Sequence, residues 1–130
     1  MTAYAVAHLR SVDQNAEILD YLLRIDATLE PFGGRFAVHG AQPEVLEGEW
    51  PGVLVVIGFP DLDAARAWYD SPGYQEILPL RTRNADGVTL LVNGVPDGYR
   101  AASFAEKLVA QAGSGSDSSS SARASGTPGR

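Results

Sequence analysis

Two segments with the alternation of β-strands are apolar on both faces, and this feature constrains the fold more than any other. In residues 52–59, valine and isoleucine point to one side of a strand, while leucine and valine point to the other. Residues 87–95 show the same pattern near their middle. An antiparallel sheet with one face in water would alternate polar and apolar residues instead. Both faces of the sheet therefore need an apolar cover.

The predicted elements follow the order βαββαβ. Strands are predicted at residues 2–10, 35–40, 52–59 and 87–95, with one helix after the first strand and another after the third. This order favours an α+β fold of the ferredoxin-like type, in which both helices pack on one face of an antiparallel sheet.

Capping residues and helical spacing define the two helices. Asp13 is the predicted N-cap of the first helix, and Asp61 is that of the second, which runs to about Asp70. Pro72 is suited to the first position of a further helical turn. The first helix is expected to bury a stripe of apolar residues, namely Ile18, Leu22, Ile25 and Leu29.

The two helices cover one face of the sheet, so the apolar second face needs another partner. The same sheet of a second copy would cover it in a symmetric homodimer. A helix predicted at residues 99–111, with Phe104 and Leu108 on one side, is the alternative cover. The first arrangement predicts a dimer in solution, and the second predicts a monomer.

The chain is predicted to contain one folded domain and a tail. Residues 1–96 form the ferredoxin-like domain, and residues 97–112 contain the further helix. Residues 113–130 are mostly glycine and serine and include no aromatic or large aliphatic side chain. Such a segment buries too little apolar surface to offset the entropy lost on ordering, so disorder is predicted there.

Charge and composition exclude several classes of partner. The net charge is −6 and Lys107 is the one lysine, whereas a surface that binds nucleic acid needs clustered basic residues. The absence of cysteine excludes disulfides and thiolate metal sites. The sequence shows neither a signal peptide nor a membrane span, so we expect a cytoplasmic protein that does not bind membranes.

Several short pieces of the sequence, in their order and spacing, resemble one bacterial family. They are Ala3-Tyr4, Gly33-Gly34-Arg35, Leu46-Glu47-Gly48-Glu49-Trp50, Phe59-Pro60, Ala67-Trp68-Tyr69-Asp70-Ser71-Pro72, Tyr74-Gln75 and Arg81. The family is domain of unknown function 1330 (DUF1330), in the dimeric α/β-barrel superfamily, and the resemblance spans residues 2–95. It implies a ferredoxin-like protomer and a homodimer whose two sheets face each other.

The chain departs from the family pattern at a few positions. Asp13-Gln14-Asn15 stands where the family usually has Asp-Pro-Glu. His39 stands where arginine is common, which makes it a weaker candidate for a general base than His8. Gly73 replaces a common glutamate, so a function that depends on that acid is not expected here.

Four residues are candidates for catalytic chemistry. His8 is a candidate general base, because imidazole titrates near neutrality, and Arg35 is suited to holding a carboxylate or enolate oxygen. Tyr74 is a candidate donor to a substrate carbonyl, and Ser71 is a candidate nucleophile. The structural alternatives are a helix cap for the serine, packing for the tyrosine and, for the arginine, an ion pair with Glu47 or Glu49.

Tyr4, Trp50, Trp68 and Arg81 are the expected ligand-binding residues. Trp50 and Trp68 combine a large apolar body with one N–H donor, which suits the wall of a small-molecule site, although core packing is the alternative. Tyr4 and Arg81 belong to the pieces that carry the family resemblance. The sequence has no HExxH motif, Walker loop or dinucleotide fingerprint, so neither a metal nor a cofactor is expected.

The sequence supports two functions and does not decide whether the protein is an enzyme. The first is a dimeric protein that binds or transforms an apolar, carbonyl-bearing small molecule without a cofactor, by proton transfer or enolate stabilisation. The second is a non-enzymatic dimeric module that senses a ligand or binds a protein. A cavity of about 300 Å³ or more with converging arginine and tyrosine favours the first. A fully packed corner around Ser71 favours the second.

Overall fold

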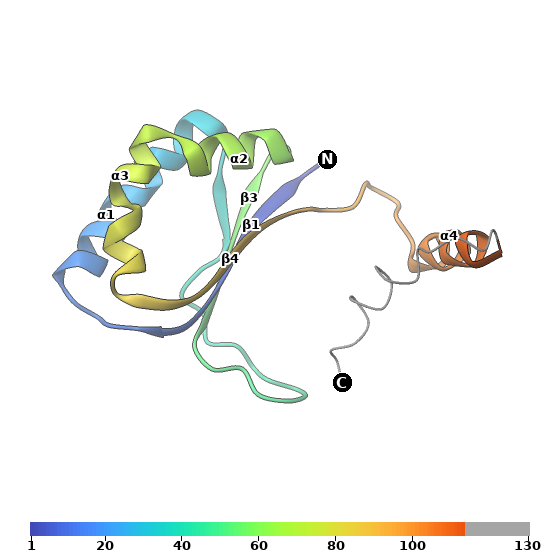
Figure 1. Ribbon diagram of the computed structural model, residues 1–130, viewed down its shortest axis with the longest axis horizontal. Helices are drawn as coiled ribbons and strands as arrows, with labels where there is room; N and C mark the ends of the chain where they lie inside the picture. Colours follow the sequence, from blue (N-terminus) through green and yellow to red (C-terminus); the bar gives the residue numbers. More distant parts are fainter. Residues whose placement is uncertain (114–130) are drawn as a thin grey trace. The chain divides into compact units, whose positions relative to one another are not determined.

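The computed structural model describes residues 1–113. They belong to two units, of which the first is Met1–Val95 and the second begins at Pro96. The first unit contains, in chain order, β1 (Ala3–Val12), α1 (Ala16–Leu29), the short 3-10 helix η1 (Glu30–Phe32), β2 (Arg35–Val38), β3 (Val53–Phe59), α2 (Leu62–Asp70), α3 (Pro72–Thr82) and β4 (Ala85–Asn93) (Figure 1). The second unit contains α4 (Ala101–Gly113). The predicted tail lies outside the described residues from residue 114 onward.

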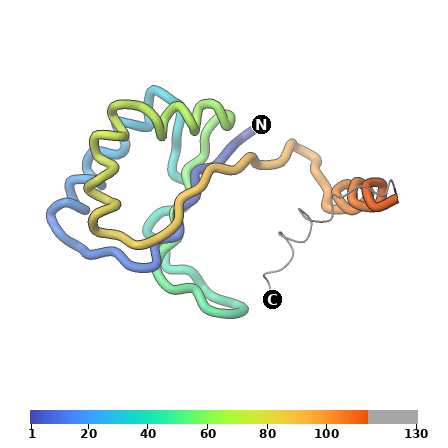
Figure 2. Tube along the Cα trace, viewed as in Figure 1, coloured from blue at the N-terminus to red at the C-terminus, as the bar shows by residue number. Residues whose placement is uncertain are grey.

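The strands of the first unit form an antiparallel sheet in the order β2-β3-β1-β4. The trace in Figure 2 shows β1 and β4 side by side, in agreement with the pairing of Ala3 with Asn93. α1, α2 and α3 lie together on one face of the sheet (Figure 1). The α+β ferredoxin-like fold predicted from the sequence is therefore confirmed, with the second helical region divided into α2 and α3 at Ser71.

Alternation along the strands decides which side chains face the helices. Ala5 of β1 and Ile57 and Phe59 of β3 are buried beneath the helices. On the opposite face of β4, three apolar side chains remain 47–49% exposed, namely Val88, Leu90 and Val92. Because the helices of the first unit lie on the other side, the apolar second face expected from the sequence is uncovered within this unit.

β-bulges interrupt this alternation in β2 and in β1. In β2, Phe36 pairs with Ile57, but Val38 pairs with Val56, so β2 holds one extra residue. β1 has a similar shift after Leu9. Beyond each bulge, a side chain lies on the face opposite to the one that it would occupy in a regular strand.

α1 begins two residues later than predicted. Asn15, and not Asp13, is its N-cap, because the Asn15 side-chain oxygen accepts a hydrogen bond from the backbone N–H of Ile18 at 3.1 Å. The bulged strand β1 extends up to the residue before Asp13, whose own N–H donates to the backbone oxygen of Asn84. The N-cap predicted at Asp61 for α2 is confirmed.

The buried stripe of α1 differs from the predicted one at a single position. Tyr21 is buried, whereas Leu22 is 39% exposed; the other three residues of the predicted stripe are buried. Both positions satisfy helical spacing relative to Ile18, so the periodicity does not distinguish them. Contact with α3 decides, because the Tyr21 hydroxyl oxygen lies 2.6 Å from that of Tyr74.

Within the described residues, the second unit contains α4, which overlaps the segment 97–112 where a further helix is predicted. It ends one residue later, at Gly113, the first residue of the predicted tail. Neither α4 nor any other helix in residues 1–113 is long and apolar enough to cross a lipid bilayer.

Candidate functional site

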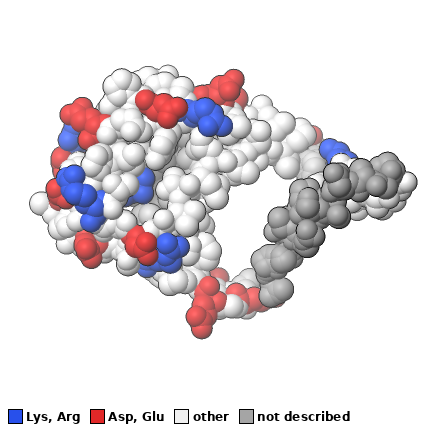
Figure 3. Space-filling model, viewed as in Figure 1, with Lys and Arg blue, Asp and Glu red and all other residues white. Residues whose placement is uncertain are grey.

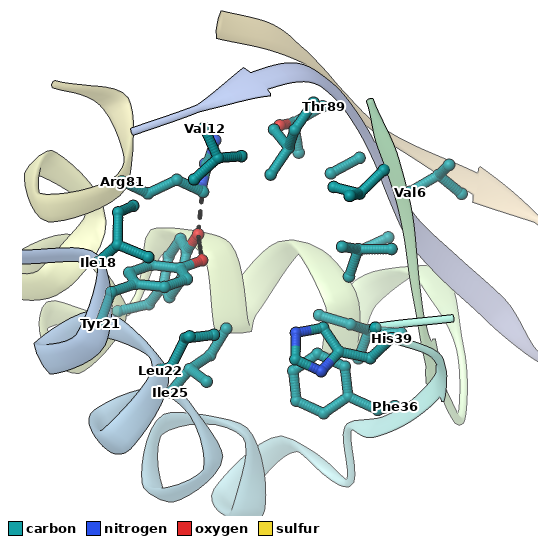
Figure 4. A pocket seen from close by; sticks show the side chains of 18 of the residues that line it. Val6, Val12, Ile18, Tyr21, Leu22, Ile25, Phe36, His39, Arg81 and Thr89 are labelled. Carbon is teal, nitrogen blue, oxygen red and sulfur yellow. Dashed lines mark hydrogen bonds between the residues drawn. The ribbon is translucent and has the colours of Figure 1, made fainter. Parts of the chain in front are cut away.

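A cavity of about 270 Å³ lies between the sheet and the helices that cover it (Figure 4). Ala5 and Ala7 of the inner strand β1 line it, and their small side chains leave space that larger residues would fill. The remaining walls are mostly aliphatic and aromatic, with contributions from Val55, Ile18 and Phe36. The cavity is therefore suited to an apolar small molecule.

One wall of the cavity is polar and consists of the Tyr–Tyr–Arg cluster, which we define as Tyr21, Tyr74 and Arg81. The two tyrosine hydroxyl oxygens are 2.6 Å apart, and Arg81 donates from Nη2 to the Tyr74 hydroxyl oxygen at 3.4 Å (Figure 4). The guanidinium carbon of Arg81 also lies 5.9 Å from the centre of the Tyr21 ring. Tyr74 and Arg81 are about two turns apart on α3, which places them on one side of that helix.

The Tyr–Tyr–Arg cluster can donate further hydrogen bonds. The two phenols carry two O–H hydrogens, and the bond between them uses one, whichever oxygen donates. Arg81 is half-buried, and no carboxylate within residues 1–113 forms an ion pair with it. Because a partly buried charge without an opposite charge beside it is costly, a negatively charged ligand oxygen would be stabilised beside Arg81.

The environment of Tyr21 predicts a loss of stability at alkaline pH. Burial, followed by the charge and hydrogen bond of Tyr74, raises the pKa of Tyr21 well above that of a free tyrosine, and a smaller effect of Arg81 opposes this. An unfolded tyrosine loses its proton near pH 10, whereas folded Tyr21 keeps it. The unfolded state is therefore favoured as the pH rises past about 10, by up to about 1.4 kcal/mol per pH unit.

Urea unfolding between about pH 8 and pH 11 measures this loss. We expect Tyr21→Phe to remove it, because phenylalanine does not ionise. Tyr69→Phe is the matched control, since the Tyr69 hydroxyl forms no hydrogen bond within the described residues, and it should retain the loss. An equally steep decline in Tyr21→Phe and in the unsubstituted protein would contradict the role given to Tyr21.

His8, Trp50 and Tyr4 lie away from the cavity. The Nε2 of His8 donates to the backbone oxygen of Pro51 at 2.6 Å, and the imidazole stacks on Trp50 with ring centres 3.9 Å apart. Tyr4 shares the face of β1 that His8 occupies, which is the face opposite to the helices. The structure brings none of these three predicted site residues to the cavity.

Arg35 also lies outside the cavity, at the start of the edge strand β2, where its side chain is exposed. In the part of the chain that the structure describes, no ion pair joins Arg35 to Glu47 or Glu49, the partners expected in the structural alternative. Figure 3 shows acidic residues at the tip of the loop between β2 and β3, to which both glutamates belong. The exposed Arg35 is thus separate from the Tyr–Tyr–Arg cluster.

Ser71 caps the turn between α2 and α3. Its Oγ donates to the backbone oxygen of Trp68 at 2.7 Å and accepts from the backbone N–H of Tyr74 at 3.2 Å. Both hydrogen bonds serve the helix ends, and Ser71 does not line the cavity. The geometry agrees with the structural alternative for Ser71, a helix cap.

Tyr74, Trp68 and Arg81 are the predicted site residues that the structure brings to the cavity. Tyr21 was not predicted as a site residue, and its one signal in the sequence is that its spacing from Ile18 also suits the buried stripe. His39 was the weaker of the two histidine candidates, yet it lines the cavity, and His8 does not. Within residues 1–113, no group of three or more histidine, cysteine or carboxylate side chains is placed to hold a metal.

Comparisons with known proteins identify the family and the fold. The DUF1330 family, a domain of unknown function, matches residues 2–95, and no curated protein matches the sequence. The RPA0582 protein of unknown function from Rhodopseudomonas palustris superposes with a TM-score of 0.55 and 16% identity, over 73% of this chain and 83% of its own. A mutant of SnoaB, a cofactor-independent oxygenase from Streptomyces nogalater, superposes with a TM-score of 0.51 and 15% identity, over 76% of this chain and 98% of its own. At such identities the likeness shows the fold alone. Because the family match spans most of the sequence, the chain belongs to the DUF1330 family.

Proposed function

We propose that the protein binds an apolar small molecule through a carbonyl or phenolate oxygen, in the cavity between the sheet and the helices α1 and α3. The observation that carries the proposal is Arg81, a half-buried cation beside two phenols in an otherwise apolar cavity, without a paired carboxylate among the described residues. A ligand oxygen that gains negative charge can accept hydrogen bonds from Arg81 and from the remaining phenol hydrogen.

The chemistry of this cluster is stabilisation of an oxyanion by protein side chains alone. SnoaB is a cofactor-independent oxygenase with a similar fold. Because one fold hosts many unrelated activities, this likeness supports cofactor-free chemistry at the cavity by analogy only. The direct support is the position of the donors, since preorganised donors in an apolar site stabilise charge that develops on a substrate oxygen.

The non-enzymatic dimeric module is the alternative function. It is supported by the dense packing of the corner around Ser71, where the rings of Trp68 and Tyr74 lie 4.1 Å apart and both side chains are 2% exposed. The cavity beside this corner, at about 270 Å³, falls slightly below the expected size of about 300 Å³, but it contains the expected arginine and tyrosine and so favours a binding protein over a module without a ligand. The titration described next tests whether the cavity takes a ligand, which separates a small-molecule-binding protein from a module that binds only a protein. A ligand sensor would also bind, so an enzyme is distinguished from it by catalysis and not by binding.

A bicyclic ketone tests the binding proposal. In a Trp50→Phe background, Trp68 of the cavity wall is the remaining tryptophan, so its fluorescence reports entry of 2-tetralone. We expect Arg81→Met to weaken 2-tetralone binding by about 10-fold or more, because a hydrogen bond from a charged group contributes about 1.5–3 kcal/mol. Binding of tetralin, which has the same rings without the oxygen, should not respond to that substitution.

Two further variants serve as controls for the ketone titration. Arg35→Met removes an arginine outside the cavity and is expected to bind 2-tetralone as tightly as the unsubstituted protein does. Ala7→Leu places a larger side chain in the cavity and is expected to weaken both 2-tetralone and tetralin. Equal 2-tetralone affinities of Arg81→Met and Arg35→Met would refute Arg81 as the anchor.

We also propose that two copies of the chain pair through the uncovered apolar face of the sheet, as the sequence predicts. The support is the row formed by Val88, Leu90 and Val92, each about half exposed on β4. A contiguous apolar surface of this kind is unfavourable in water, and the same surface on a second copy is self-complementary in a two-fold dimer.

Size-exclusion chromatography with light scattering tests the pairing. We expect the unsubstituted chain to be a dimer at about 10–50 µM, and Leu90→Asp to be a monomer, because it places a charge at the centre of the interface. Leu23→Asp is the matched control, since Leu23 is 74% exposed on α1 over the helix-covered side, and it should remain a dimer. If the unsubstituted chain is a monomer at these concentrations, the proposed dimer is refuted.

A further inference from the structure

His39 faces the cavity because of the bulge in β2. In a regular strand, Phe36 and Val38 would share one face, and His39 would take the other. The bulge instead pairs Val38 with Val56 on the second face of the sheet, so His39 falls on the same face as Phe36, toward the helices. The two rings pack with their centres 4.6 Å apart, and both residues line the cavity.

His39 and the Tyr–Tyr–Arg cluster lie on opposite sides of the cavity (Figure 4). Among the described residues that line the cavity, the titratable side chains are Tyr21, Tyr74, Arg81 and His39. Of these side-chain types, imidazole is the one that ordinarily changes charge between about pH 5 and pH 8.

The ring nitrogens of His39 are available for proton transfer, because neither has a hydrogen-bond partner within residues 1–113. His8 differs in this respect, since its Nε2 is bonded to the backbone oxygen of Pro51. The cavity thus has donors for an oxyanion on one side and a potential proton acceptor on the other.

We propose that His39 is the general base of this cavity and removes a proton from the carbon next to the ligand carbonyl. This inference rests on the function proposed above. The electron pair of the C–H bond forms the C=C bond of the enolate, the carbonyl π electrons move to the oxygen, and the proton ends on a ring nitrogen of His39. Tyr74 and Arg81 stabilise the oxygen as it gains negative charge. Return of a proton to carbon reverses the step, so no further reactant is needed.

Exchange of the 2-tetralone α-protons in D2O, followed by NMR, tests the role of His39. The full chain is expected to accelerate exchange at the carbon between the aromatic ring and the carbonyl. His39→Gln should slow the catalysed exchange by about 100-fold or more, while the dissociation constant of 2-tetralone from Trp68 fluorescence changes by less than about twofold.

His8→Gln is the matched control, because it makes the same substitution on the opposite face of the sheet. It is expected to leave the exchange rate unchanged. Exchange as fast in His39→Gln as in the unsubstituted chain, or lost in His8→Gln, overturns the role of His39. Binding without catalysed exchange overturns it as well, but leaves the binding function intact. Failure of 2-tetralone to bind would overturn the binding function and, with it, the role of His39.

Discussion

Replacing Trp68 with alanine is expected to lower the free energy of unfolding by about 3–5 kcal/mol. The Trp68 side chain is 2% exposed, and its ring centre lies 4.1 Å from that of Tyr74 and 5.4 Å from that of Phe59. Its indole N–H also donates to Thr28 Oγ1 at 3.0 Å. Truncation removes these contacts and leaves a void where α2, α3 and the sheet meet. Urea unfolding followed by far-UV circular dichroism measures the loss.

Trp50 provides the matched control for this experiment, because it is the other tryptophan of the chain and is 38% exposed. Its main contact is the stack on His8, and an aromatic pair contributes about 0.5–1.5 kcal/mol, so Trp50→Ala should cost about 1 kcal/mol. If Trp68→Ala does not fold, Trp68→Phe retains part of the ring volume and should show a smaller loss. Similar losses for Trp68→Ala and Trp50→Ala would contradict the central position of Trp68 in the core.

Replacing Gly52 with alanine is expected to cost about 2–5 kcal/mol. Gly52 has φ +92°, and positive φ costs a residue with a side chain about 1–2 kcal/mol. A Cβ at this position would also overlap the carbonyl oxygen of Leu9 and lie 2.7 Å from the Cα of Arg10, and overpacking adds about 1–3 kcal/mol. The clash falls where β3 meets β1 beside the cavity. Denaturant unfolding of the purified variant checks the loss.

Gly48→Ala separates the two contributions at Gly52. Gly48 has φ +79° in the same loop, and a Cβ there would meet no atom within 4 Å. We expect Gly48→Ala to lose only the backbone contribution of about 1–2 kcal/mol. A loss at Gly52 no larger than the loss at Gly48 would show that the contact with Leu9 relaxes at little cost.

The fold was predictable because its signals are local in the sequence. The alternation in residues 52–59 is present in eight consecutive residues, and each predicted strand has its counterpart in the sheet. The family resemblance over residues 2–95 is confirmed for the same reason, since short pieces in a defined order carry it. The homodimer, by contrast, stays a prediction, because the uncovered face shows a need for a partner and not which partner meets it.

Element ends and the buried stripe were less predictable because neighbouring residues were equally suitable. Asp13 and Asn15 are both suitable N-caps for α1. Asn15 is the N-cap in the structure because the bulged strand β1 extends up to the residue before Asp13. Tyr21 and Leu22 both satisfy helical spacing for the buried stripe. Tyr21 is the buried one because its hydroxyl contacts that of Tyr74, 53 residues away in the sequence. Distant contacts of this kind override local preference, because the energy of burial depends on what lies opposite.

The sequence by itself determined the order of strands and helices, the two apolar faces of the sheet and the family. Only the tertiary structure decided which polar residues meet. Tyr21, Tyr74 and Arg81 come together because α1 packs on α3, and no spacing along the chain encodes that contact. One extra residue in β2 turns His39 toward the cavity, while the regular part of β1 keeps His8 on the opposite face. Periodicity predicts the face of a residue only as long as the strand stays regular, so the residues of the candidate site depended on a bulge and a helix contact.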